Sequence, residues 1–121
     1  MTDAAKIAAA YIAAWNETDP SLRRALINDG WAEDATYVDP LMSGRGRDQI
    51  DGLIAAVQGR FAGCRFRLIG QADGHGDHVR FAWALGPEGD EEMIKGSDYA
   101  VVESGRLRSV TGFLDKVPAT A

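Results

Sequence analysis

The 121-residue sequence contains one cysteine, Cys64, and two histidines. A single cysteine cannot form an internal disulfide, and no group of cysteine and histidine residues has zinc-ligand spacing. The longest apolar run, residues 7–15, has nine residues, whereas a membrane-spanning helix needs about 20. We therefore expect no disulfide, no metal site and no membrane span.

Basic residues are also few, with 13 Lys and Arg against 18 Asp and Glu and a net charge of −5. Binding to nucleic acid depends on clustered basic residues, so no nucleic-acid partner is expected. Asp3 and an alanine-rich segment stand where a signal peptide would have a basic stretch, which favours a cytoplasmic location. The length predicts a single domain over residues 1–121.

The first half of the chain has helical periodicity. An alanine-rich helix is expected from about Asp3 to Glu17, and Asp19-Pro20 caps a second helix that ends near Gly30. A third helix should begin at Arg47 or Asp48, after a glycine-rich loop. These three segments each present one apolar face.

The second half of the chain alternates between apolar and polar residues. The alternating segments are separated by Gly/Asp turns and comprise residues 64–72, 77–86, 92–103 and 107–115. A shorter β-prone run precedes Pro40 at residues 35–39. Three helices followed by hairpin-linked strands predict an α+β fold, with the helices packed on a strongly bent antiparallel sheet.

Two acidic residues do not lie where a solvated carboxyl is expected. Asp98 is within a strand pattern and shares its face with Ile94 and Val102. Strands are depleted in aspartate, and a carboxyl on an apolar face is either hydrogen-bonded or protonated. Asp39 ends the β-prone run directly before Pro40. Both carboxyls are therefore candidates for a functional site.

Tyr11 is the third candidate, on the apolar face of the first helix. Each candidate also has a structural explanation. A tyrosine in this position is commonly a core residue with a satisfied hydroxyl, and aspartate before proline commonly starts a turn. Asp98 could be tied to a backbone amide. Only the combination of the three residues favours a catalytic interpretation.

Three short motifs carry a resemblance to a known superfamily. They are the segment Trp31-Ala-Glu-Asp-Ala-Thr-Tyr-Val-Asp-Pro40, the helix start Gly46-Arg-Asp-Gln-Ile50, and the closing hairpin from Gly105 to Phe113. Over about residues 3–116 the chain resembles the nuclear-transport-factor-2-like superfamily, in its ketosteroid-isomerase and SnoaL-like polyketide-cyclase branches. The resemblance implies a conical α+β barrel, open at one end.

The resemblance also implies roles for the three candidates. In the isomerase branch, Asp39 would be the general base, and Tyr11 and Asp98 would donate hydrogen bonds to an enolate oxygen. That role needs a protonated Asp98, as in the known isomerases. In the cyclase branch, the acid that matches Asp98 is the main acid/base of an intramolecular aldol closure. Both reactions pass through an enolate, and the residues do not separate them.

The sequence departs from the isomerases behind the tyrosine. Trp31 and Ile54 stand where further tyrosines would support it, so Tyr11 is expected to act alone. Eight residues are expected to line the substrate pocket: Trp15, Leu53, Phe61, Phe81, Trp83, Val110, Gly112 and Leu114.

Related epoxide hydrolases need two acids and an arginine. Arg80 lies on the strand face opposite Phe81 and Trp83, and Ala82 stands where a companion acid would be. Hydrolysis is therefore not expected.

The sequence thus predicts a cofactor-independent acid/base enzyme that isomerises or cyclises a small apolar carbonyl compound. The alternative is a ligand-binding or dimerisation module with the same pocket, since fold does not fix function. A second copy is expected to cover the outer sheet face, in a homodimer. That face carries Ala82, Ala84, Tyr99, Val101, Thr111 and Phe113.

Overall fold

Three helices occupy the first half of the chain in the computed structural model, which describes residues 3–118. They are α1 (Ala4–Asn16), α2 (Pro20–Gly30) and α3 (Gly46–Arg60). The side chain of Asp3 caps α1 and that of Asp19 caps α2, each by accepting a backbone N–H of the first turn. The predicted helices are therefore present, close to their expected bounds.

Six strands form one sheet in the order β2-β1-β6-β5-β4-β3. Their bounds are β1 Trp31–Val38, β2 Ser43–Arg45, β3 Arg65–His75, β4 His78–Gly86, β5 Ile94–Glu103 and β6 Arg106–Lys116. All neighbouring strands are antiparallel except β1 and β6, which are parallel. Because β1 and β6 are far apart in sequence, no hairpin forces them to be antiparallel. The sheet is curved and does not close.

The β1 and β2 region differs most from the sequence prediction. β1 begins at Trp31, directly after α2, and its register against β6 shifts between Trp31 and Thr36. This shift interrupts the alternation that would have revealed the first half of the strand. β2 pairs its Gly44 with Tyr37 of β1. With three residues, this strand is too short to give a periodic signal in the sequence.

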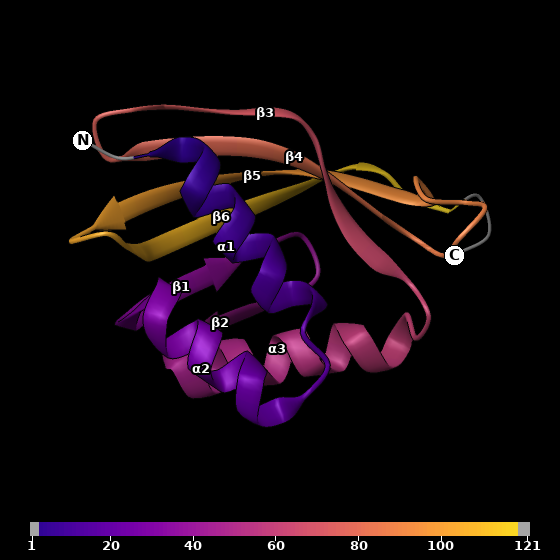
Figure 1. The fold of residues 1–121 in the computed structure, drawn as a ribbon, viewed down its shortest axis with the longest axis horizontal. Coiled ribbons are helices and arrows are strands. Elements are labelled where there is room, and N and C mark those ends of the chain that lie inside the picture. Colours follow the sequence, from indigo (N-terminus) through magenta and orange to yellow (C-terminus); the bar gives the residue numbers. More distant parts are fainter. Residues whose placement is uncertain (1–2, 119–121) are drawn as a thin grey trace.

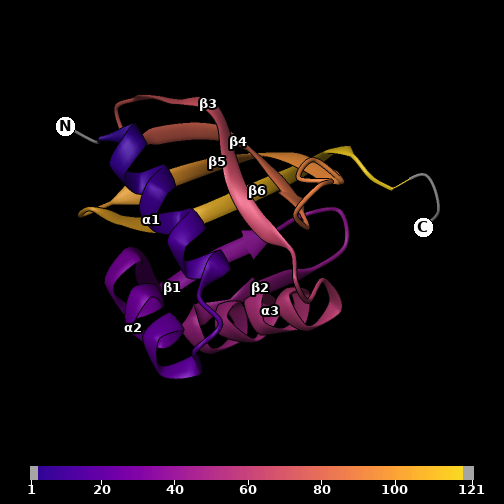
Figure 2. The ribbon, with the colours of Figure 1, turned by 45° about the vertical axis from the view of Figure 1, so that its right-hand side comes forward.

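The helices lie on one side of the curved sheet, as Figures 1 and 2 show. α1 packs mainly on β3, and α3 packs on β1 and β2. The core between these layers includes the fully buried side chains of Ile27, Ile54 and Val110. No helix within residues 3–118 is both long and apolar enough to cross a membrane.

Strand alternation sorts the side chains as expected. In β5, Ile94, Gly96, Asp98, Ala100 and Val102 are buried and face the helices. Asp98 is 3% exposed. The sequence pattern therefore predicted correctly that this carboxyl points inward.

A buried arginine fixes the helices against one another. Arg23 is 6% exposed, and its guanidinium donates hydrogen bonds to Asp51 at 2.6 Å and to the side-chain oxygen of Gln58 at 2.9 Å. The Gln58 amide donates in turn to the carbonyl oxygens of Trp15 at 3.0 Å and Glu17 at 2.8 Å. This network satisfies the carbonyls at the end of α1, and it sets the position of Trp15.

Candidate active site

A cavity of about 510 Å³ lies between the helices and the concave face of the sheet. Most of its lining residues are aromatic or aliphatic, and its charged residues are Asp39, Asp98 and Arg60. The described lining comprises Tyr11, Ile12, Trp15, Tyr37, Asp39, Leu41, Met42, Ala56, Val57, Arg60, Phe61, Phe66, Trp83, Leu85, Ile94, Asp98, Phe113, Leu114, Val117 and Pro118. All three predicted catalytic residues therefore lie on one cavity.

Asp98 lies at the buried end of this cavity. Its Oδ2 accepts a hydrogen bond from the Tyr11 hydroxyl at 2.5 Å, and its Oδ1 accepts one from the indole Nε1–H of Trp83 at 3.1 Å. Burial raises the pKa of Asp98 to about 6, although the hydrogen bonds from Tyr11 and Trp83 oppose that rise. The carboxyl can therefore gain or lose a proton near neutral pH.

Gly96 makes room for this arrangement. It pairs with Trp83 across β4 and β5, and a Cβ atom placed on Gly96 would lie 2.6 Å from Cε2 of the indole. The absence of a side chain lets the indole lie against the strand, two residues from Asp98.

Asp39 and Tyr37 form a second acid–hydroxyl pair. Asp39 Oδ2 accepts a hydrogen bond from the Tyr37 hydroxyl at 2.7 Å, and Oδ1 accepts the backbone N–H groups of Leu41 and Met42 at 2.8 and 2.9 Å. The same side chain thus shapes the turn after β1 and holds a phenol in the cavity. Burial and the nearby Asp98 raise the pKa of Tyr37 well above its ordinary value, so this phenol stays protonated.

Gly112 of β6 lies where the two pairs meet. A Cβ atom placed on it would lie 2.9 Å from Asp98 Oδ1, 3.3 Å from Asp39 Cβ and 3.5 Å from the Tyr37 hydroxyl. A larger residue would need space that these groups occupy. Glycine at this position therefore leaves space for the Asp98 carboxyl, the Asp39 side chain and the Tyr37 hydroxyl.

Half of the predicted pocket residues line the cavity. Those that do are Trp15, Phe61, Trp83 and Leu114, and those outside its described lining are Leu53, Phe81, Val110 and Gly112. Gly112 lies next to the acids, with no side chain to present to the cavity.

The other three residues face the correct side of the fold but are covered by neighbours. The Phe81 ring packs edge-on against the Tyr11 ring, with centroids 4.9 Å apart. Leu53 of α3 packs towards Gly44 of β2, with Cδ1 3.0 Å from that residue's hypothetical Cβ position. Val110 is 1% exposed and belongs to the core. Strand and helix parity identifies the inward face, but it does not distinguish a cavity wall from solid core.

Sequence reasoning missed Tyr37. Ala35, Tyr37 and Asp39 have the same parity, and the first two are buried, so alternation could have placed the phenol beside the acid. Trp31 and Ile54 are buried in the core, and the Trp31 ring lies 5.8 Å from the Tyr11 ring between centroids. Tyr11 is nevertheless not the only phenol on the described cavity lining, because Tyr37 also lines it. The neighbouring Tyr11 hydroxyl partly lowers the raised pKa of Tyr37.

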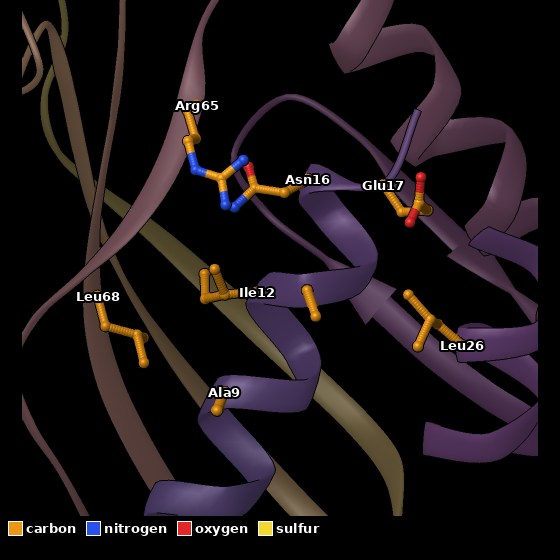
Figure 3. A pocket seen from close by; sticks show the side chains of 8 residues that line it. Ala9, Ile12, Asn16, Glu17, Leu26, Arg65 and Leu68 are labelled. Carbon is orange, nitrogen blue, oxygen red and sulfur yellow. The ribbon is translucent and has the colours of Figure 1, made fainter. Parts of the chain in front are cut away.

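A second hollow lies outside the cavity, between α1 and β3 (Figure 3). Its polar lining consists of Asn16, Glu17 and Arg65. Asn16 is already engaged, because its side chain donates to the carbonyl oxygen of Phe66 at 2.9 Å and accepts that residue's N–H at 2.8 Å. These two hydrogen bonds hold the end of α1 against β3.

Arg80 and His78 of β4 lie outside the described lining of the cavity. Arg80 is exposed and forms an ion pair with Asp73 at 3.1 Å, on the face of β4 opposite the buried Phe81. His78 hydrogen-bonds the exposed Tyr99 hydroxyl. Within residues 3–118, no group of three or more His, Cys, Asp or Glu residues is arranged to hold a metal ion.

Comparison of the chain with known proteins identifies its family. The SnoaL-like domain family matches residues 8–110. The chain belongs to the SnoaL-like family. A solved structure from Agrobacterium tumefaciens, described as a candidate isomerase of that family, is 44% identical with a TM-score of 0.90, and the match covers 95% of this chain and 99% of that one. No curated protein matches the sequence.

Two further structures share the fold at lower identity. A hypothetical protein from Catenulispora acidiphila, with a ketosteroid isomerase-like fold and solved in complex with trimethylamine, is 25% identical over 93% of this chain and 85% of that one, with a TM-score of 0.72. A candidate polyketide cyclase from Sinorhizobium meliloti is 15% identical over 88% of this SnoaL-like chain and 93% of its own, with a TM-score of 0.71. The latter match shows the fold alone.

Proposed function

We propose that this SnoaL-like protein is a cofactor-independent acid/base enzyme acting on a small apolar carbonyl compound. The observation that carries the proposal is the environment of Asp98, a carboxyl at the buried end of an apolar cavity, held by two donors and with a pKa of about 6. A general base is most effective when its pKa is near the working pH.

The proposed reaction begins with proton removal beside the carbonyl. The ionised Asp98 takes a proton from the α-carbon, the C–H electron pair moves towards the carbonyl, and the negative charge transfers to the carbonyl oxygen. A neutral Asp98 is a weaker acceptor for the Tyr11 hydroxyl, which then donates to the enolate oxygen. The negative charge leaves the carboxyl as it forms on the substrate.

The second step decides the product. In an isomerisation, Asp98 returns the proton to another carbon of the enolate. In an intramolecular aldol closure, the enolate carbon attacks a second carbonyl, and the new alkoxide takes the proton from Asp98. Both routes balance without a cofactor, and both regenerate the carboxylate.

We assign Asp39 to the placement of Tyr37. The isomerase resemblance suggested Asp39 as the base, but three donors occupy its oxygens, and two of them are backbone amides of its own turn. Because the single proton of the Tyr37 hydroxyl is donated to Asp39 Oδ2, this phenol presents an acceptor oxygen to the cavity.

Binding without catalysis is the second candidate function. The Catenulispora structure, solved in complex with trimethylamine, favours it, because a protein of this fold there is bound to a small molecule. A binding module would use the same cavity walls, without proton transfer at Asp98.

The test is deuterium exchange at the α-carbons of a panel of small cyclic ketones in D₂O, followed by NMR. We expect Asp98→Asn to slow the exchange by about 10²-fold or more, within the range for general bases, and Asp39→Asn to slow it less. Asp34→Asn, at an exposed position of β1, is the control. If the wild type exchanges no ketone but binds them as tightly as Asp98→Asn does, the binding-module interpretation replaces the enzyme.

A further inference from the structure

Four aromatic rings form a continuous wall in the cavity. Tyr37 and Trp15 have ring centroids 5.6 Å apart, Trp15 and Phe66 5.4 Å, and Phe66 and Trp83 5.3 Å. All four residues line the cavity. They come from β1, α1, β3 and β4, so this aromatic wall exists only in the folded protein.

The two carboxyls close the wall into a ring. Tyr37, at one end, donates to Asp39, and Trp83, at the other, donates to Asp98. Both acidic side chains lie close to Gly112, where a Cβ atom would lie 2.9 Å from Asp98 Oδ1 and 3.3 Å from Asp39 Cβ. Four rings and two carboxyls therefore surround the buried end of the cavity.

No positive charge balances these acids within the ring. Their hydrogen-bond donors are hydroxyl, indole and backbone N–H groups, which are neutral. Among the described lining residues Arg60 is the only basic one, and it is exposed at the end of α3. The ring thus combines carboxyl groups with aromatic side chains, and carboxylates and aromatic rings both attract a cation.

We propose that this ring binds a small alkylammonium cation. The ammonium group is held against Asp98 while its methyl or methylene groups contact the aromatic wall, as in the recognition of alkylated ammonium ligands by aromatic cages. The site overlaps the proposed catalytic site, but the inference rests on the cavity and not on catalysis. Such a cation would occupy the base and compete with a carbonyl substrate.

Ligands of similar shape and different charge test whether binding requires a positive charge on the ligand. Trimethylammonium, tetramethylammonium and the neutral, similarly branched tert-butanol are titrated into the protein near pH 7.5 by calorimetry or NMR. Few atoms limit the affinity of such ligands, so the tightest dissociation constant expected is on the order of 0.1 mM. We expect both cations to bind at least about tenfold more tightly than tert-butanol, and trimethylammonium to be the tighter cation because its N–H can donate to a carboxylate.

Variants locate the site. Asp98→Asn should weaken cation binding by about tenfold or more and leave tert-butanol unaffected, Phe66→Leu should weaken both cations, and Asp34→Asn should change nothing. Equal affinity for tert-butanol and the cations, or cation binding that survives Asp98→Asn and Phe66→Leu unchanged, would overturn the proposal. Ketone exchange is measured on the same samples, so that loss of catalysis and loss of cation binding are scored separately.

Discussion

The buried carboxyl of Asp98 should make the stability of the protein depend on pH in a direction opposite to that of a salt-bridged aspartate. An aspartate with an ordinary pKa of 3.8 reaches about 6 in the folded protein. This difference corresponds to about 3 kcal/mol in the free energy of unfolding. Between these two values the folded state binds more protons than the unfolded chain, so stability falls as pH rises through the window and levels off above about pH 7.

The Asp98→Asn variant has no ionisable group at this position, so it is the variant to compare with the wild type. Of the 3 kcal/mol, roughly half is lost between pH 5 and pH 8, as follows from the two pKa values. The wild type should therefore lose about this much relative to Asp98→Asn over that range. Urea unfolding followed by tryptophan fluorescence at several pH values measures the difference, with Asp34→Asn as the control for loss of a surface carboxyl.

The reasoning would be refuted by a stability difference between wild type and Asp98→Asn that is constant from pH 5 to pH 8. It would also be refuted if the difference changed with the opposite sign. The rate of ketone exchange provides an independent check. Its pH–rate profile should rise with pH and have its midpoint near pH 6, where the carboxyl of Asp98 ionises.

Three further predictions follow from contacts in and around the cavity. Gly112→Ala should move the Asp98 carboxyl, which lies 2.9 Å from the new Cβ position, and slow ketone exchange at least tenfold in NMR assays; an unchanged rate would contradict the packing argument. Trp83→Phe removes a hydrogen bond that lowers the pKa of Asp98, so the limb of the pH–rate profile should move to higher pH, and a limb that stays in place would contradict the role of the indole. We propose a homodimer through the outer sheet face, where Tyr99 is 39% exposed; light scattering should give twice the monomer mass at micromolar concentration and a smaller mass for Tyr99→Glu, and a monomeric wild type would exclude this interface.

Local sequence signals were sufficient for most of the secondary structure. Caps at Asp3 and Asp19 define two helix starts, and alternation defines β3 to β6 within a few residues. The signal failed at β2 and at the first half of β1, where a three-residue strand and a register shift interrupt the periodicity. Periodicity needs several regular residues to be visible.

The inward direction of Asp98 was also determined by the sequence, because strand parity is a local property. Tyr11 and Asp39 were candidates for separate local reasons, and their convergence on one cavity required the fold. The hydrogen-bond partners of these residues could also be identified only from the fold. The bond from Trp83 to Asp98 depends on Gly96 leaving space across the strand pair, and nothing within either strand alone predicts it.

The shortage of cysteine, basic residues and long apolar runs argued against a disulfide, a nucleic-acid partner and a membrane span. The helical and strand periodicities determined an α+β chain with an inward carboxyl. The tertiary structure alone decided which inward residues face empty space. Phe81 and Trp83 have the same parity, yet one is covered by Tyr11 while the other lines the cavity and bonds to Asp98. That distinction depends on how a curved sheet and three helices fit together, and side-chain volumes from distant segments decide it.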